Sequence, residues 1–357
     1  MEAIRSKTRT LLYGAYGYTG RLTAELAASK GFDLVLAGRD KNALGRLGRR
    51  LRFETRVVGL TNATELAAAL QDIACVIHMA GPFAMTATPM LNACLATRTN
   101  YIDITGEIAV FEAMWSRKEE IRQSGTTVIP GAGFDVIPTD CLARYVASKC
   151  DHPASLAIAV RALQSVSQGT LRTAIQQVSR PVLCRRDAAI VAVNGEPTRE
   201  LHLGSRMEPY VPVSWGDVAT AFYSTGVRNI TVYIRRTKLL RAANFLAKLF
   251  GPILRSKRGQ RVLAAIVRMF PEGPSLSKRR AQKAMVWAES SDLSGKSFRA
   301  SLFTPGAYDF AANSALEVAS RIDSLPAPLG LVTPSQAFGA DFVLSLPGCS
   351  RQDIPTR

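Results

Sequence analysis

Histidine and paired cysteine are scarce in this 357-residue chain, and their scarcity excludes several kinds of chemistry. The three histidines lie far apart, and no H-E-x-x-H motif occurs. The six cysteines are scattered without a C-x-x-C pair, so no zinc-binding spacing is present and we expect no metal. A G-x-S-x-G motif is also missing, which removes the sequence signature of a serine hydrolase of the α/β-hydrolase type.

Long apolar runs are missing as well. No apolar stretch reaches the length of a membrane span without a charged residue, and the N-terminal residues have no apolar core of a signal peptide. Several cysteines lie inside apolar runs, which is typical of buried free thiols in a reducing compartment. We therefore expect a cytoplasmic protein, and its length favours two domains.

Acidic residues are absent from Arg235–Arg268, although this stretch contains ten basic residues. The net charge of the chain is +17, and residues 151–357 contribute most of it. An amphipathic helical pattern covers 239–270. A basic segment at 235–283 can pack on its own domain, lie peripherally on an anionic membrane surface, or dock an acidic acyl carrier protein. No nucleic-acid-binding motif accompanies the charge, so we expect no nucleic acid as a partner.

What the chain does contain is a glycine-spaced turn near its start. An apolar run, Leu11–Tyr13, is followed by a G-x-x-G-x-x-G pattern and then by a helical pattern over 21–28. In dinucleotide-binding folds, such glycines permit a tight turn, a close approach of the backbone to the pyrophosphate, and close packing of helix on strand. The cofactor-binding residues predicted in this turn are Gly14, Tyr16, Gly17, Tyr18, Thr19 and Gly20.

The second strand pattern ends in Gly38-Arg39-Asp40. This position, about twenty residues after the glycines, is where the residue facing the adenosine ribose lies in dinucleotide-binding folds. An acid there binds the ribose hydroxyls of NAD, whereas an arginine can hold the 2′-phosphate of NADP. Arg39 therefore favours NADP over NAD. Asp40 keeps NAD open, and the alternative interpretation of Arg39 is an exposed loop cation.

Strand and helix patterns alternate over residues 1–150. Strands are predicted at 11–13, 34–37, 55–59, 74–79, 101–105 and 126–130, and helices at 41–51, 63–70, 89–97, 110–124 and 139–149. The strands are short, nearly continuous apolar runs. This alternation predicts an α/β fold with a Rossmann-type, doubly wound parallel sheet.

The rhythm changes after residue 150 to an antiparallel α+β pattern. A hairpin is predicted from 188–193 through the turn Asn194-Gly195-Glu196-Pro197 to 198–203. Such a pattern is typical of a substrate-binding second domain.

Small and polar residues follow the fourth predicted strand. Ala80-Gly81-Pro82 comes directly after it, at the carboxyl edge where open α/β sheets bind ligands, and is predicted to contact the cofactor. A simple turn at the end of the strand is the alternative. His78 lies within the strand's apolar run and is interpreted as a core histidine rather than a catalytic one.

Carboxylates and hydroxyls follow the next two strands. Asp103, Thr105 and Glu107 alternate at the end of the fifth strand, so we expect them near the reactive end of the cofactor. Asp135 and Asp140 follow the sixth strand. Asp140 could instead be a first-turn partner of a helix dipole.

One motif is interpreted as a coincidence. Tyr145 and Lys149 match the Y-x-x-x-K dyad of short-chain dehydrogenases. In that family the dyad lies on the helix after the fifth strand, with a serine or threonine upstream. Here a strand–helix unit over 101–124 intervenes, and Ala132 occupies the upstream position.

Taken together, these segments resemble the saccharopine dehydrogenase-like oxidoreductases, a family that includes bacterial trans-acting enoyl reductases. The resembling segments are 13–22, 36–39, Gly81-Pro82-Phe83, 101–107, 133–140, Gly169-Thr170, 307–310 and 333–340. Where relatives often have a threonine after Tyr-Asp-Phe, this chain has Ala311.

The resemblance implies that a Rossmann domain at 1–150 is completed by residues from about 305 to 357, and that residues 151–304 form an inserted α+β domain for substrate binding and for dimerisation. It implies an NADP-type cofactor held by the glycine turn and Arg39. It also implies hydride transfer to an unsaturated acyl chain or another apolar substrate, as in lipid metabolism. Asp103, Thr105, Glu107 and Thr170 are the candidates for catalytic groups. Reduction of a saccharopine-type imine is an alternative, which converging arginines in the second domain would favour. A non-catalytic NADP-binding protein at a membrane surface is another.

Overall fold

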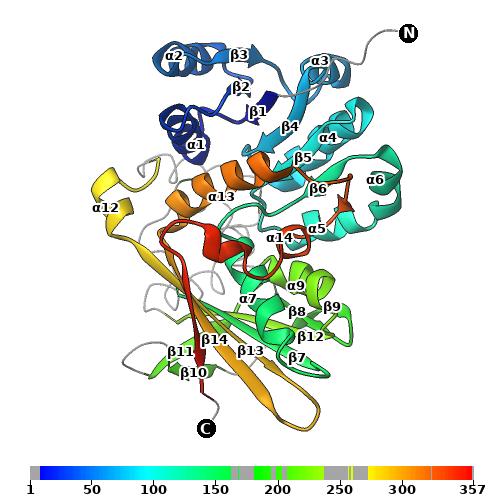
Figure 1. Cartoon of the computed structure of the whole chain (residues 1–357), viewed down its shortest axis with the longest axis vertical. Coiled ribbons are helices and arrows are strands. Elements are labelled where there is room, and N and C mark those ends of the chain that lie inside the picture. The colour runs from blue at the N-terminus through cyan, green and yellow to red at the C-terminus, as the bar shows by residue number, and fades with distance from the viewer. Residues whose placement is uncertain are drawn as a thin grey trace. The chain divides into compact units, whose positions relative to one another are not determined.

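The computed structural model describes residues 9–161, 168, 181–193, 198–202, 207–236, 256, 259, 272–322 and 324–355. The chain divides into two compact units, Met1–Cys141 with Ala307–Cys349 and Leu142–Gly306 with Ser350–Arg357 (Figure 1). The corresponding divisions predicted from the sequence lie at 150 and 304. Each unit is built on its own sheet.

A parallel sheet forms the centre of the first unit. Within the described residues its seven strands have the order β15-β6-β5-β4-β1-β2-β3, and each pair runs parallel. The strands are β1 (Arg9–Tyr13), β2 (Leu34–Gly38), β3 (Glu54–Val57), β4 (Ile73–His78), β5 (Asn100–Asp103), β6 (Thr127–Ile129) and β15 (Gly330–Leu331). The order reverses at β1, between β2 and β4, which is the switch point where such sheets bind ligands. The predicted doubly wound α/β fold is confirmed.

Helices cover both faces of this sheet. They are α1 (Tyr18–Ser29), α2 (Lys41–Leu51), α3 (Ala63–Ala68), α4 (Phe83–Thr97), α5 (Ile108–Trp115), α6 (Lys118–Ser124), α13 (Ala307–Ile322) and α14 (Pro334–Phe338). Helices α1 and α13 pack side by side (Figure 1). A wholly buried cluster that includes Leu11, Val76 and Met90 fills one layer between sheet and helices. Burial on both faces explains why the strands are apolar throughout.

Helix α4 begins earlier than predicted. The sequence placed its start at Pro89, but Pro89 lies inside the helix, which begins at Phe83. The carboxylate of Glu107 accepts hydrogen bonds from the first two amides of the helix, Phe83 and Ala84. This cap comes from a residue that is distant in sequence, and it stabilises a helix start that no neighbouring residue predicts.

A nine-stranded mixed sheet forms the centre of the second unit. Its main path among the described strands is β10-β11-β12-β7-β13-β14-β16, with β8 and β9 paired beside β12. The strands are β7 (Ser155–Arg161), β8 (Val182–Arg186), β9 (Ala189–Val193), β10 (Arg199–His202), β11 (Met207–Pro212), β12 (Asn229–Arg235), β13 (Lys283–Ser291), β14 (Ser297–Pro305) and β16 (Ser350–Ile354). The helices α9 (Asp217–Thr225) and α12 (Leu276–Ala281) belong to this unit, and α7 (Ile137–Ala147) spans the division.

The predicted hairpin at 188–203 is wrong. Strand β9 pairs with the preceding β8, not with β10, and β10 pairs with β11. Asp187 and Ala188 make the turn, with φ angles of 46° and 68°. Two successive residues with positive φ match the twist of a hairpin, although Ala188 gives no sequence signal for one. The Asn194-Gly195 signal lies outside the described residues.

The last strand also differs from expectation. Residues up to 357 were predicted to complete the first domain, but β16 pairs antiparallel with β14 in the second sheet. Tyr145 holds this strand to α7, because its hydroxyl donates to the Asp353 carboxylate at 2.9 Å and the Arg351 guanidinium lies 3.4 Å from its ring centroid. The Y-x-x-x-K spacing thus has a structural explanation within the second unit.

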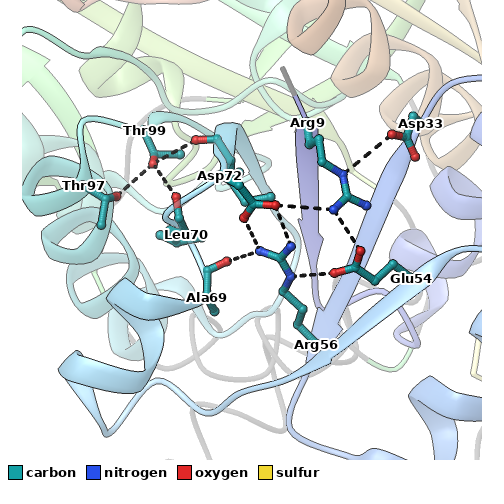
Figure 2. Close-up of polar contacts among 10 residues, drawn as sticks. Arg9, Asp33, Glu54, Arg56, Ala69, Leu70, Asp72, Thr97 and Thr99 are labelled. Carbon is teal, nitrogen blue, oxygen red and sulfur yellow. Dashed lines mark hydrogen bonds and ion pairs between the residues drawn. The ribbon is translucent and has the colours of Figure 1, made fainter. Parts of the chain in front are cut away.

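An ion-pair network ties the amino ends of the first three strands together (Figure 2). Arg56 on β3 pairs in bidentate fashion with Asp72, at 2.6 and 2.8 Å, and also contacts Glu54. Arg9 on β1 reaches Glu54 and Asp72, and lies 3.8 Å from Asp33. The hydrogen bond from Arg56 is the main cause that lowers the pKa of Asp72, to about 2.

Replacing Arg56 by glutamine is expected to lower the free energy of unfolding at neutral pH by about 1 kcal/mol, since solvent screens these part-exposed pairs. The Asp72 carboxylate stabilises the fold above its unfolded-state pKa of about 4 and loses that contribution as the pH falls towards its folded-state value. R56Q should therefore lose less stability than wild type over this acid range in urea titrations. R122Q, which breaks the more exposed pair of Arg122 with Glu119, is the control. Equal curves of stability against pH for R56Q and wild type would show that Arg56 does not lower the pKa of Asp72.

No helix in the described parts of the chain is long and apolar enough to cross a membrane. The basic amphipathic pattern at 239–270 lies outside the described residues, apart from Ser256 and Gly259.

Candidate cofactor and active site

The glycine turn after β1 forms a tightly packed backbone cradle. Gly14 has a φ of +82°, and a Cβ atom there would lie 2.9 Å from the Cβ of Ala80. A Cβ on Gly20 would lie 2.3 Å from the carbonyl oxygen of Gly14, so α1 can start this close to the strand only with glycine. The amide of Gly17 donates to the Gly14 carbonyl at 3.0 Å, and that of Gly14 to Ala37 on β2 at 2.9 Å.

The first turn of α1 offers its backbone amides to an anion. The N-cap residue Gly17 makes no side-chain capping bond, and the first turn contains no acidic residue. Gly17 is exposed. A helix N-terminus of this kind provides N–H donors and the positive end of the helix dipole, which suit a pyrophosphate. The cradle thus fits the dinucleotide that the sequence predicted.

Two tyrosines of the turn point to different neighbours. A Cβ on Gly38 would lie 2.6 Å from the Tyr16 ring, so this ring covers the end of β2. No sequence pattern predicted that Gly38 is needed for this contact. Tyr18 makes an edge-to-face contact with Tyr308 on α13, with ring centroids 5.0 Å apart. Tyr18 therefore helps to fix α1 against α13.

Arg39 and Asp40 have separate roles at the end of β2. The Asp40 carboxylate caps α2 by accepting the Ala43 amide at 2.9 Å. The Arg39 side chain is exposed at the carboxyl edge of the sheet. Burial raises the pKa of the Tyr13 phenol, while the charge of Arg39 acts to lower it, so this charge lies near the end of β1. Asp40, the acid that left NAD as an alternative cofactor, thus caps the helix that follows it.

The loop after β4 is fixed from two sides. The Thr86 hydroxyl donates to the carbonyls of Ala80 and Pro82, at 2.6 and 3.1 Å. Gly81 and Pro82 are exposed at the carboxyl edge, and the peptide bond between them is cis. Glu107 caps the helix that follows, at 2.9 Å to the Phe83 amide. The predicted cofactor-contacting loop is therefore held by α4 and by the end of β5.

Asp103 is wholly buried at the end of β5 and binds donors of its own chain. One carboxylate oxygen accepts the amides of Thr105 and Gly131, each at 2.9 Å, and the other accepts the Tyr101 hydroxyl at 2.7 Å. Burial, the largest cause, raises the pKa of Asp103 to about 6, although these hydrogen bonds act to lower it. Asp103 thereby joins the turns that follow β5 and β6.

Thr105 and Glu107 continue this chain of contacts. The wholly buried Thr105 hydroxyl accepts the Glu107 amide at 3.2 Å. The two oxygens of Glu107 accept the Phe83 and Ala84 amides, at 2.9 and 3.1 Å. The three polar residues after β5 therefore form a hydrogen-bonded path from the end of β5 to the start of α4. Sequence reasoning missed this capping role.

Replacing Glu107 by alanine is expected to lower the free energy of unfolding by about 1–2 kcal/mol, because a charged N-cap of α4 is lost. Glu107→Gln keeps one carbonyl acceptor for Phe83 or Ala84 and should lose less than half as much. Urea unfolding followed by circular dichroism measures both variants. An E107A protein as stable as wild type would show that the cap does not stabilise α4.

Asp135 lies against the turn that follows β5. A Cβ on Gly106 would come within 3.0 Å of the Asp135 Cβ and 3.1 Å of its Oδ2, so the carboxyl group packs directly on this glycine. Asp135 keeps partial exposure, and burial raises its pKa to about 6. A carboxyl group with this pKa can exchange a proton near neutral pH. In the sequence, Gly106 is marked only by its place between Thr105 and Glu107, which does not predict its contact with Asp135.

Asp140 and His78 are both wholly buried. The Oδ2 of Asp140 accepts the Ser335 amide at the start of α14, at 2.8 Å, and thus joins α7 to α14. His78 packs among the rings of Tyr13 and Phe83, and neither of its nitrogens has a hydrogen-bond partner in the described structure. Burial lowers the pKa of His78 to about 3, so this histidine is neutral.

Thr170, the remaining candidate, lies outside the described residues. Within the described ranges, no group of three or more His, Cys, Asp or Glu side chains is arranged to hold a metal ion.

Comparisons with known proteins find similar domains and a similar fold. Residues 10–129 match the family model of the saccharopine dehydrogenase NADP-binding domain. A trans-acting enoyl reductase of Mycobacterium tuberculosis is 30% identical over 149 residues, covering 36% of this chain and 33% of that protein. A saccharopine dehydrogenase-like oxidoreductase of Bos taurus is 28% identical over 179 residues, covering 44% and 41%. The chain thus matches about a third to two fifths of the length of these relatives.

The fold agrees as well. Saccharopine dehydrogenase (L-Glu forming) of Saccharomyces cerevisiae superposes with a TM-score of 0.65 at 11% identity, covering 97% of this chain and 100% of that chain. At this identity the likeness is one of fold. Residues 10–129 are thus similar to the NADP-binding domain of the saccharopine dehydrogenase family, which confirms the predicted family resemblance and the predicted NADP cofactor.

Proposed function

We propose that this protein is an NADPH-dependent oxidoreductase that reduces the carbon–carbon double bond of an unsaturated acyl substrate. The observation that carries the proposal is the arrangement of one sheet edge, where the glycine cradle and Arg39 lie at one end and the part-exposed acid Asp135 at the other. Several relatives are named trans-acting enoyl reductases, which supports an enoyl substrate.

The cofactor half of this edge is built from backbone. Gly14, Gly17 and the first turn of α1 would hold the pyrophosphate, and Arg39 the 2′-phosphate. Strands β2, β1, β4 and β5 are neighbours in the sheet. Because adjacent strands lie about 4.8 Å apart, their ends span roughly 14 Å, which suits an extended dinucleotide. When bound, NADPH would supply a hydride to the substrate.

The reaction also needs a proton at the carbon next to the carbonyl group. We assign this proton to Asp135, since it combines partial exposure at the edge with a pKa near 6. We assign Asp103, Thr105 and Glu107 to holding the edge rather than to the chemistry, because Asp103 and Thr105 are wholly buried and Glu107 caps α4.

Delivery of the substrate involves the basic segment in this proposal. An acidic acyl carrier protein or an anionic membrane surface would bind the segment 235–283 and present the acyl chain there. Helix α12 contributes Lys278, Arg279 and Arg280 to this basic segment. A homodimer through the second unit is part of the same proposal.

Mixing the purified protein with NADPH and a panel of substrates tests the function. We expect cofactor-fluorescence changes on binding and consumption of NADPH with 2-enoyl thioesters. Consumption with imines of amino acids, but not with enoyl thioesters, would favour the saccharopine-type alternative. Binding of NADPH without turnover of any substrate in the panel would favour a non-catalytic NADP-binding protein.

A further inference from the structure

The loop after β4, residues 80–82, lies directly against the glycine turn of the cofactor cradle. A Cβ on Gly14 would lie 2.9 Å from both the Cβ and the amide nitrogen of Ala80, so no side chain fits between the two backbones. The Met79 amide donates to the Tyr13 carbonyl at 2.9 Å and joins the two strands just before this contact. The position of Ala80 therefore limits where the glycine turn can lie at the sheet edge.

One side-chain hydroxyl holds this loop from the first turn of α4. The Oγ1 of Thr86 lies 2.6 Å from the carbonyl oxygen of Ala80 and 3.1 Å from that of Pro82. A hydroxyl has one hydrogen, so the shorter contact is the main bond. In the described parts of the chain no other donor reaches the Ala80 carbonyl, whereas the Pro82 carbonyl also accepts the Met85 amide at 3.1 Å. The Thr86 hydroxyl is thus the bond that fixes the peptide group of Ala80.

We propose, on the basis of the cofactor site in the proposed function, that Thr86 is a positioning residue for the dinucleotide and acts on the glycine turn through Ala80. Thr86 itself is half-buried, whereas Gly17 in the cradle is exposed. Strands β4 and β2 flank β1 in the sheet, so the loop that Thr86 holds and Arg39 lie on opposite sides of the glycine turn. Loss of the hydroxyl should therefore affect the pyrophosphate that NADPH and NADH share, and not the 2′-phosphate that distinguishes them.

Fluorescence titration of Thr86→Val with NADPH and with NADH is the test. Valine keeps the branching at Cβ and removes the hydroxyl. We expect both dinucleotides to bind more weakly by the same factor, about threefold to tenfold, which corresponds to the loss of one neutral hydrogen bond. Thr86→Ser keeps the hydroxyl and should restore both affinities to the wild-type values.

Adenosine 2′-monophosphate separates positioning from a general loss of structure, because it contains neither the pyrophosphate nor the nicotinamide. Measured by calorimetry, T86V should bind it as tightly as wild type, whereas R39A should bind it more weakly. The matched control T97V removes a hydroxyl from the other end of α4, where Thr97 donates to the Ala93 carbonyl at 2.8 Å. T97V should lower the stability in urea and leave both dinucleotide affinities unchanged.

Several results would overturn the proposal. Unchanged affinities for NADPH and NADH in T86V would remove the positioning role, and equal weakening of adenosine 2′-monophosphate or equal losses in T97V would leave Thr86 a structural role only. A loss for NADPH alone would place Thr86 with Arg39 at the 2′-phosphate. Wild type that binds neither dinucleotide would overturn the proposed function as well, whereas failure in the variants alone would not. Circular dichroism must show that T86V folds, and T86A, which also lacks the hydroxyl, keeps the test valid if it does not.

Discussion

Arg39→Ala is expected to weaken NADPH binding by about 10- to 100-fold while NADH binding changes less than twofold. A hydrogen bond to a charged group contributes roughly 1.5–3 kcal/mol, and each 1.4 kcal/mol corresponds to about a factor of ten. The exposed guanidinium at the end of β2 is placed for the 2′-phosphate, which NADH lacks. Fluorescence titration with both dinucleotides measures the ratio.

Two further variants sharpen this test. Arg39→Lys keeps the charge but loses the planar fork, so we expect an intermediate loss for NADPH. Arg46→Ala removes an exposed charge from α2, one turn away from the strand end, and should leave both dinucleotides unaffected. Equal losses of NADPH and NADH in R39A would show that Arg39 does not discriminate between them.

Asp135→Asn is expected to lower kcat about 100-fold or more while the Kd for NADPH changes little, because it removes the proposed proton donor and leaves the cradle intact. The protonated acid is the active form in reduction. Since the pKa of Asp135 is raised to about 6, the acid form predominates below that pH, and kcat should fall about tenfold per pH unit above it. In D135N this pH dependence should disappear.

Asp103 is the matched control, since its pKa is also raised to about 6. In D103N the amide oxygen can still accept the Thr105 and Gly131 amides, and the amide nitrogen can donate to the Tyr101 hydroxyl. We expect D103N to keep both most of its kcat and the pH dependence. Loss of the pH dependence in D103N, with its retention in D135N, would transfer the proton-donor assignment to Asp103.

Local patterns of the sequence were enough to predict the cofactor half of the site. The glycine spacing is set by backbone contacts within a few residues, such as the approach of Gly20 to the Gly14 carbonyl. The order of strands and helices follows from apolar periodicity, which is also a local property. The glycine turn and the parallel sheet could therefore be predicted from the sequence alone.

The reactive half depends on contacts between residues that are distant in sequence. Glu107 caps a helix that begins 24 residues before it, and nothing near either residue signals the pair. The packing of Asp135 on Gly106 likewise requires two turns to meet. The pairing of β9 with β8 was missed because Ala188 has a positive φ at the second turn position, where a two-residue hairpin normally has glycine. Such contacts are determined by tertiary packing.

The return of β16 to the second sheet divides the second unit into two chain segments, Leu142–Gly306 and Ser350–Arg357. A stop codon after Cys349 would leave all of the nucleotide-binding residues in place, yet it would expose the edge of β14 and strip Tyr145 of both Arg351 and Asp353. Excising either unit for separate expression consequently requires a spliced gene, with the segment 307–349 joined to the first unit and the final strand to the second.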